Sequence, residues 1–310
     1  MHFKTMKLSP EAFSRAAAFL KGSDPLHAAL FGFHFESGPA ERVRAALEAL
    51  QDGDGGFRRL EPDVGLPGST VLSTCHALHI LHEIGTPTGH PSVQRALDYL
   101  LATYDPGLEA WPIIPPHDNS RPHAPWWEYS DAFVGNWGRF QDNPRPDVLA
   151  CLHLFPCDKT TKLRGTVDRS VSARIQAGDK SIDMHGLICH VRLALAPGLP
   201  DELRRALDGA LPAWIGQGVE RDPSKWSGYG LRPLDVAPLA GSPWDGLLAA
   251  DLPNNLDFLI QGQSEDGSWH PHWNWGDSFP EAWPAARRAW QAQLTLKALR
   301  SLASHGRIAK

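Results

Sequence analysis

A polar and aromatic run at positions 117–131 holds the densest group of side chains that could transfer protons. A carboxyl group buried beside indole rings loses hydration, which raises its pKa and lets it act as an acid near neutral pH. A neighbouring histidine or tyrosine could then remove or relay the proton. The catalytic candidates in this run are His123, Glu128, Tyr129 and Asp131. The alternative is that this run is a rigid loop in which these side chains only hold the backbone through hydrogen bonds.

Tryptophan is unusually frequent in this chain, with twelve residues against four tyrosines. Indole rings form large packing surfaces, and in an apolar cavity their faces can stabilise a cation. We therefore expect a few of them to contact a hydrophobic substrate, while most serve packing. The substrate-binding candidates are Trp126, Trp127, Trp137, Trp273 and one helical histidine, His79.

Histidine and cysteine also occur at spacings that could hold a metal ion, because residues three or four positions apart share one helix face. The motifs with high metal specificity, Cys-x-x-Cys and His-Glu-x-x-His, do not occur in the chain. The sequence therefore favours partly buried histidines without a metal, and it identifies no cofactor. The conceivable ligand sets are Cys75 with His79 and His82, His185 with Cys189 and His190, and His117 with Asp118 and His123.

Two segments share an unusual turn that closes a helix with an aromatic residue. One reads Phe258-Leu259, then Gln263, then Asp266-Gly267-Ser268-Trp269, and the other runs from Gln51 through Asp54-Gly55 to Phe57. The first resembles the repeat signature of the squalene–hopene cyclase and protein prenyltransferase superfamily. That resemblance implies helix hairpins arranged as an (α/α) toroid around a central cavity, with inner helices lining it.

The catalytic motifs of that superfamily are missing here. Its alkene-protonating cyclases carry Asp-x-Asp-Asp, its diphosphate-ionising members carry Asp-Asp-x-x-Asp, and its prenyltransferases bind zinc through Asp-x-Cys and a distant histidine. None of these patterns occurs in the chain. The segment Asp52-Gly53-Asp54-Gly55 is superficially similar to the first, but we assign it to the repeat turn. Conventional initiation by that aspartate motif is therefore not expected.

The elements that would position these residues are predicted to be helices. Apolar positions recur at helical spacing over 69–84 and from Pro91 to about Thr103, and later over 147–155 and 179–195. Gly/Pro turns separate the helices, and no convincing strand intervenes, so we predict an all-α fold. Asp147 is interpreted as part of a helix cap, with an inward-facing carboxylate as the alternative.

The helical spacing of apolar residues does not continue between 111 and 146. Prolines in this segment are incompatible with a long helix, and its aromatic residues are incompatible with disorder. Long ordered loops are usually functional, and we place this one over the mouth of the cavity. The organisation expected is thus a single (α/α)-toroid domain over 1–310 with an aromatic insertion at 111–146.

Composition limits the function classes. The net charge is −5, and no basic cluster interleaves with the aromatics, which argues against nucleic acid as a partner. No apolar run is long enough to span a membrane, and the start, Met1 to Lys7, does not have the pattern of a signal peptide. Four scattered cysteines are typical of reduced thiols, so a cytoplasmic location is expected.

Three hypotheses follow. The first is a terpenoid-cyclase-like enzyme, an isomerase or prenyltransferase-like protein, acting on an isoprenoid or similarly hydrophobic small molecule by acid–base or carbocation chemistry. The second is a carbohydrate-active (α/α)-toroid enzyme using paired carboxylates and Trp platforms. The third is a non-catalytic toroid that binds a lipid-like ligand or a protein.

Overall fold

The helices begin where capping residues end the preceding turn. In the computed structural model, which describes residues 5–178 and 182–309, Ser9 and Asp24 accept hydrogen bonds from the first turns of α1 (Pro10–Lys21) and α2 (Pro25–Phe35). Asp183 caps α9 (Met184–Leu195) in the same way. The predicted start of that helix at Asp179 and the first four residues of the chain lie outside the described residues.

The described residues form fourteen α-helices and contain only isolated β-bridges, so the all-α prediction is confirmed. The chain divides into two compact units, Leu47–Gly218 and a second made of Met1–Ala46 with Val219–Lys310. No helix in the described ranges is both long and apolar enough to cross a membrane.

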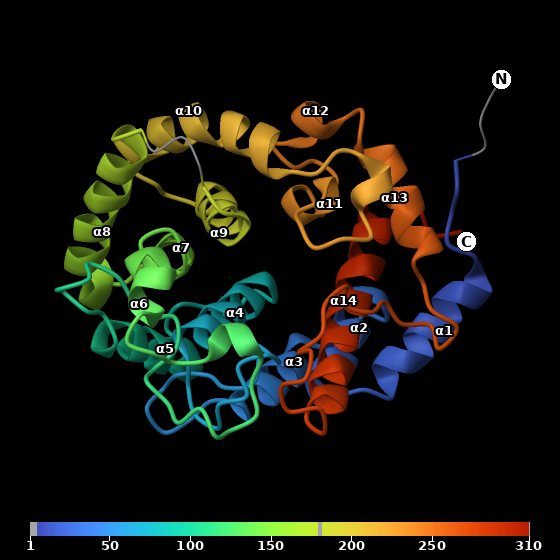
Figure 1. The fold of residues 1–310 in the computed structure, drawn as a ribbon, viewed down its shortest axis with the longest axis horizontal. Coiled ribbons are helices and arrows are strands. Elements are labelled where there is room, and N and C mark those ends of the chain that lie inside the picture. Colours follow the sequence, from blue (N-terminus) through green and yellow to red (C-terminus); the bar gives the residue numbers. More distant parts are fainter. Residues whose placement is uncertain (1–4, 179–181, 310) are drawn as a thin grey trace. The chain divides into compact units, whose positions relative to one another are not determined.

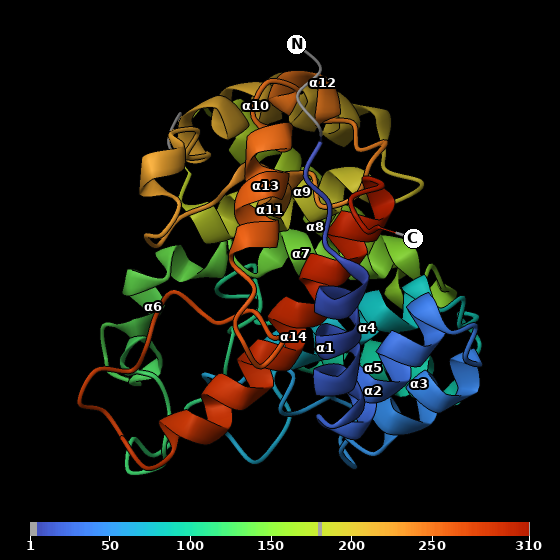
Figure 2. The same cartoon turned by 90° about the vertical axis from the view of Figure 1, so that its right-hand side faces the viewer.

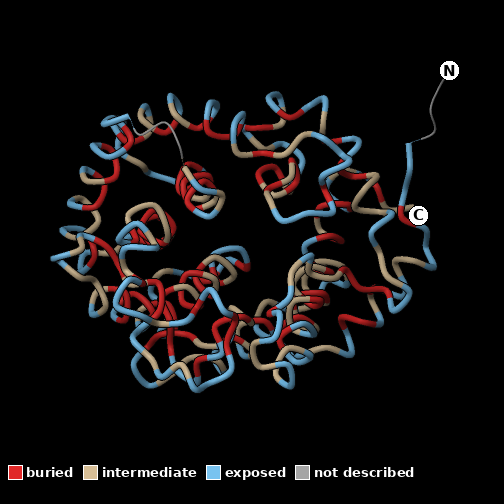
Figure 3. The backbone as a smooth tube through the Cα atoms, viewed as in Figure 1, coloured by how far each residue is buried: buried red, intermediate tan, exposed pale blue. Residues whose placement is uncertain are grey.

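The unit Leu47–Gly218 consists of helix hairpins in two layers (Figure 1). In one layer, α7 packs against both α4 and α9; in the other, α8 packs against α5 and α10. The helices of the first layer are α4 (Val71–Glu83), α7 (Arg145–Leu154) and α9, and those of the second are α5 (Pro91–Ala102), α8 (Asp158–Gln176) and α10 (Asp201–Gly218). Because α7 lies between neighbours, nine of its ten residues are buried. Figure 3 colours the backbone by burial, with buried residues in red.

The other unit joins the two ends of the chain. Helix α14 (Trp283–Ser304) packs on α1 and α2, as Figure 2 shows. Leu8 and Ile308 form a parallel bridge beside these helices. The remaining elements of this unit are most of α3 (Ala40–Glu48), α11 (Pro233–Val236), α12 (Asp245–Leu248) and α13 (Leu252–Gln261).

The two turns recognised in the sequence form the same set of hydrogen bonds. Gln263 donates to the carbonyl of Gly267 and to Ala12 of α1, and Gln51 donates to Gly55 and to Ser92 of α5. The backbone N–H of the closing aromatic residue also has the same type of partner in both turns, the hydroxyl of Thr295 for Trp269 and that of Thr74 for Phe57. In each turn, one glutamine and one aromatic residue therefore bond to two helices from elsewhere in the chain.

Replacing Gly267 by alanine should lower the free energy of unfolding by about 3 kcal/mol. Its φ of +86° is strained for an L-residue, and an added Cβ would lie 2.6 Å from the carbonyl oxygen of Arg15. Gly306→Ala is the matched control, because Gly306 has a φ of +65° but no atom within 4 Å of an added Cβ, so about 1 kcal/mol is expected. Urea denaturation measures both, and equal losses would show that the contact with Arg15 is unimportant.

The 111–146 segment is ordered by its own side chains. The rings of Trp127 and Trp137 stack at 4.7 Å between centroids with an interplanar angle of 3°. Asn119 exchanges two hydrogen bonds with the backbone of Tyr129, and the Ala124 amide donates to the carbonyl of Asp63. Only short helical turns occur before α7, namely η1 (Pro125–Trp127), α6 (Phe133–Asn136) and η2 (Gly138–Phe140).

Candidate acid-base site

The residues proposed as catalytic from the sequence are spread over the aromatic segment. Glu128 and Asp131 are exposed, whereas His123 is buried with its Nδ1 2.5 Å from the carbonyl oxygen of Arg121. Tyr129 is half-buried against Phe133, with 5.0 Å between ring centroids. The two carboxyl groups therefore do not have the apolar surroundings on which their proposed role depends.

The proposed substrate-binding residues also fall in different places. Trp127 and Trp137 form the stacked pair, and Trp126 beside them is 41% exposed. Trp273 belongs to the other unit, where its ring meets those of Tyr229 and Trp290 edge-on. Only His79 lies in a cluster of buried titratable groups.

That cluster is centred on Asp147, in the first turn of α7. Its Oδ1 lies 2.7 Å from Nε2 of His79 on α4, and its Oδ2 accepts a hydrogen bond of 2.8 Å from Nη1 of Arg192 on α9. The Asp147 carboxylate is buried, while the side chain of Arg192 remains 40% exposed. One carboxylate thus ties together all three helices of its layer.

The charge on Asp147 is set by these partners. Burial alone would raise its pKa, but the Arg192 guanidinium and the His79 ring outweigh that effect and hold the pKa of Asp147 well below its usual range. The same attraction raises the pKa of Arg192 despite its loss of hydration. Asp147 is therefore an anion at neutral pH and cannot serve as a proton donor.

Hydrogen bonds fix the protonated nitrogen in two histidines of α4. An ionised carboxylate only accepts, so Nε2 of His79 carries a hydrogen, and its Nδ1 forms no hydrogen bond with the described residues. Nδ1 of His76 lies 3.1 Å from the carbonyl oxygen of Leu60 and must donate to it, which leaves Nε2 with a lone pair. Burial and the nearby Arg192 charge lower the pKa of His76 to about 4. His76 is thus a neutral ring with a basic nitrogen.

The carboxyl group of Glu61, in the loop before α4, has its pKa shifted in the opposite direction to that of Asp147. Burial and, next, the negative charge of Asp63 raise the pKa of Glu61 to about 8, against a smaller opposing effect of Arg192. Glu61 as a whole residue is only half-buried. A carboxyl group with this pKa is largely protonated at neutral pH, as a general acid must be.

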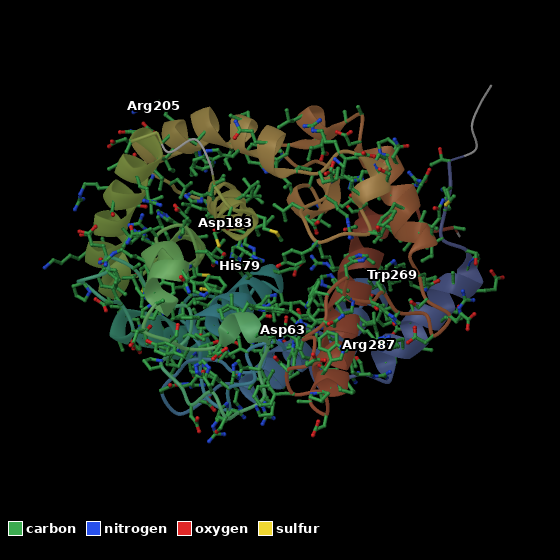
Figure 4. The ribbon with its side chains drawn as sticks, in the orientation of Figure 1. Asp63, His79, Asp183, Arg205, Trp269 and Arg287 are labelled. Carbon is green, nitrogen blue, oxygen red and sulfur yellow. The ribbon has the colours of Figure 1, made fainter. Side chains whose placement is uncertain are left out.

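The loop that carries Glu61 is held beside α4 by hydroxyl groups: Ser73 and Thr74 accept hydrogen bonds from the amides of Leu60 and Phe57. In the same loop, the backbone carbonyl of Asp63 accepts a hydrogen bond from the Ala124 amide. Figure 4 labels Asp63 on this loop and His79 on α4. Glu61, Asp63, His76, His79, Asp147 and Arg192 together are called the Asp147 cluster below.

Three buried cysteines lie around the cluster, but they are poorly suited to catalysis. A hydrogen bond with Cys151 and burial raise the pKa of the Cys75 thiol, and burial raises those of Cys151 and Cys189. Cys151 lies 3.8 Å from Nε2 of His79, the nitrogen already bonded to Asp147, so His79 cannot act as its base in a triad. Among the described residues, no group of three His, Cys, Asp or Glu side chains is arranged to hold a metal ion.

Sequence reasoning did not single out Glu61 or Arg192. The signals were Glu61-Pro62-Asp63, two carboxyl groups in the loop that precedes α4, and His76 and His79 one turn apart on that helix. No protein-family model matches the chain, and no curated protein matches it in sequence.

Proposed function

We propose that the chain is an acid–base isomerase or cyclase for a neutral, hydrophobic substrate of the isoprenoid class, with Glu61 as the proton donor. The observation that carries this proposal is a carboxylic acid with a pKa of about 8 at Glu61, directly after Leu60, whose carbonyl accepts a hydrogen bond from the neutral imidazole of His76. An acid held protonated next to a second carboxylate is what protonation of an alkene or epoxide requires, and Asp63 supplies that second group.

The proposed reaction returns every proton it uses. Glu61 gives its proton to a substrate double bond, leaving a carboxylate and a substrate cation. Nε2 of His76 then removes a proton from a neighbouring carbon, and a new double bond forms. Proton exchange with water restores both groups, so the product is an isomer of the substrate.

In this proposal Asp147 acts as a positioning residue. Its carboxylate holds His79 and Arg192, and Arg192 influences both catalytic groups by lowering the pKa of His76 and opposing the rise at Glu61. A cation beside His76 favours the neutral imidazole that the deprotonation step needs.

The repeat turns and paired helices support a related proposal for the architecture. We propose that the hairpins form an (α/α) toroid in which α4, α7 and α9 belong to the inner layer. The resemblance of Phe258 to Trp269 to the cyclase repeat supports this arrangement, and Glu61 would take the role of the missing aspartate motif.

Solvent deuterium tests the proposed activity. The purified protein is incubated in D₂O buffer with detergent-dispersed squalene, farnesol or geranylgeraniol, and products are analysed by gas chromatography and mass spectrometry. We expect at least one product that is isomeric with its substrate and carries a single deuterium from solvent, absent from heat-denatured protein. Recovery of all three substrates unchanged and unlabelled would contradict the proposed isoprenoid chemistry.

A further inference from the structure

A pocket of about 230 Å³ lies in the unit that contains α14, outside the Asp147 cluster. Its walls come from the segment before α14 and from the first turns of that helix. The lining residues are His270, Pro271, Trp273, Asn274, Trp283 and Arg287. A volume of this size holds a single six-membered ring with its substituents, not a long isoprenoid chain.

The polar groups that the pocket offers are hydrogen-bond donors. Arg287 donates through Nη2 to Nδ1 of His270 at 3.1 Å, and its other N–H groups have no hydrogen-bond partner among the described residues. The amide oxygen of Asn274 accepts from Gly276, so its NH₂ group is left to donate. A guanidinium beside an amide donor is suited to bind a carboxylate.

The position of the guanidinium is set by its neighbours. Arg287 lies one helical turn after Trp283, so both side chains project from the same face of α14. Because Arg287 only donates, His270 must accept through Nδ1, and its Nε2 lies 3.8 Å from Asp266. The hydrogen bond to His270 orients the arginine head group at the pocket.

Two indole rings and Pro271 form the apolar part of the lining. The Trp273 ring packs edge-on against Trp290 at 5.0 Å between centroids, and Trp283 is tilted against Trp275 at 5.6 Å. These ring contacts fix the positions of the Trp273 and Trp283 side chains. Indole faces bind aromatic rings through dispersion and the C–H faces of sugar rings through C–H contacts.

We propose that this pocket binds a small carboxylate carried on a six-membered ring, either a sugar acid or an aromatic acid. Arg287 and Asn274 bind the carboxylate, and the indoles of Trp273 and Trp283 contact the ring. The site is independent of the proposed chemistry at Glu61, so either assignment can fail without the other.

Titration followed by NMR tests this proposal on the full-length protein. Indole N–H signals of ¹⁵N-labelled protein are assigned to Trp273 and Trp283 with the variants Trp273→Phe and Trp283→Phe. Sodium glucuronate and sodium benzoate are compared with their neutral analogues glucose and benzamide. We expect saturable shifts of both indole signals with at least one acid and about tenfold weaker binding of its neutral analogue. Which acid binds distinguishes the sugar source from the aromatic source.

Arg287→Gln should weaken binding of that acid by about tenfold or more, because the charged donor is lost. Arg288→Gln is the matched control: this neighbouring arginine packs over the ring of Phe19 and is not part of the pocket. The amide spectrum shows that each variant is folded. The proposal is overturned if neither acid shifts both indole signals, if the neutral analogues bind equally well, or if both arginine variants weaken binding equally.

Discussion

Asp147→Asn should lower the free energy of unfolding at pH 7 by about 3 kcal/mol, the low end of the range for removing one partner of a buried ion pair. The amide cannot balance the Arg192 charge, and it presents a donor where two donors already point. The loss stays at the low end because Arg192 is 40% exposed and water can partly replace the carboxylate. Urea denaturation of the wild type and the variant measures the difference.

The pH dependence of this difference has a definite sign. Because the folded-state pKa of Asp147 lies below its unfolded value, its contribution is present above about pH 4 and is lost as the pH falls through the folded pKa. The gap between wild type and variant should therefore be largest near neutrality and shrink in acid. Asp98→Asn, which breaks the exposed pair with Lys159, is the control and should cost about 0.5 kcal/mol or less. A similarly small loss for Asp147→Asn would show that the cluster does not anchor its helices.

Glu61→Gln should reduce the proposed isomerisation by about 10³-fold, within the range found for removing a general acid. The two side chains have nearly the same shape, and Glu61 is mostly neutral at pH 7, so stability should change little. Glu61→Gln should thus lower the rate without lowering stability, whereas Asp147→Asn should mainly lower stability. The rate of deuterium incorporation and the urea midpoint are measured on the same samples.

The pH profile of the rate supplies a second check. Activity should fall above about pH 8, where Glu61 loses its proton, and below about pH 4, where His76 gains one. Glu202→Gln, an exposed substitution on α10, is the control and should leave the rate unchanged. Retention of activity in Glu61→Gln, or a rate that rises between pH 7 and pH 9, would exclude Glu61 as the acid.

Local chemistry made the helical parts of this protein predictable. Ser9 with Pro10 starts a helix, and the turns at Gln51 and Gln263 depend on the positive φ of Gly55 and Gly267 and on glutamine side chains four residues before the carbonyls they bond. The all-α class follows from such short-range preferences and from the apolar spacing along each helix. The aromatic segment was also recognisable, because proline and tryptophan act locally on backbone and packing.

The candidate site depends on contacts between residues far apart in the chain. His79 and Asp147 are separated by 68 positions, and Asp147 and Arg192 by 45, so no local pattern identifies them as partners. The pKa of a carboxyl group depends on what surrounds it: Glu61 and Asp147 lie in one unit and are shifted in opposite directions, while Glu128 and Asp131 are exposed despite their tryptophan neighbours. The sequence by itself determined the helices and the repeat turns, because those depend on neighbouring residues. Only the tertiary structure decided which acid is buried, which is paired and which is left in water, because hydration and charge act through space.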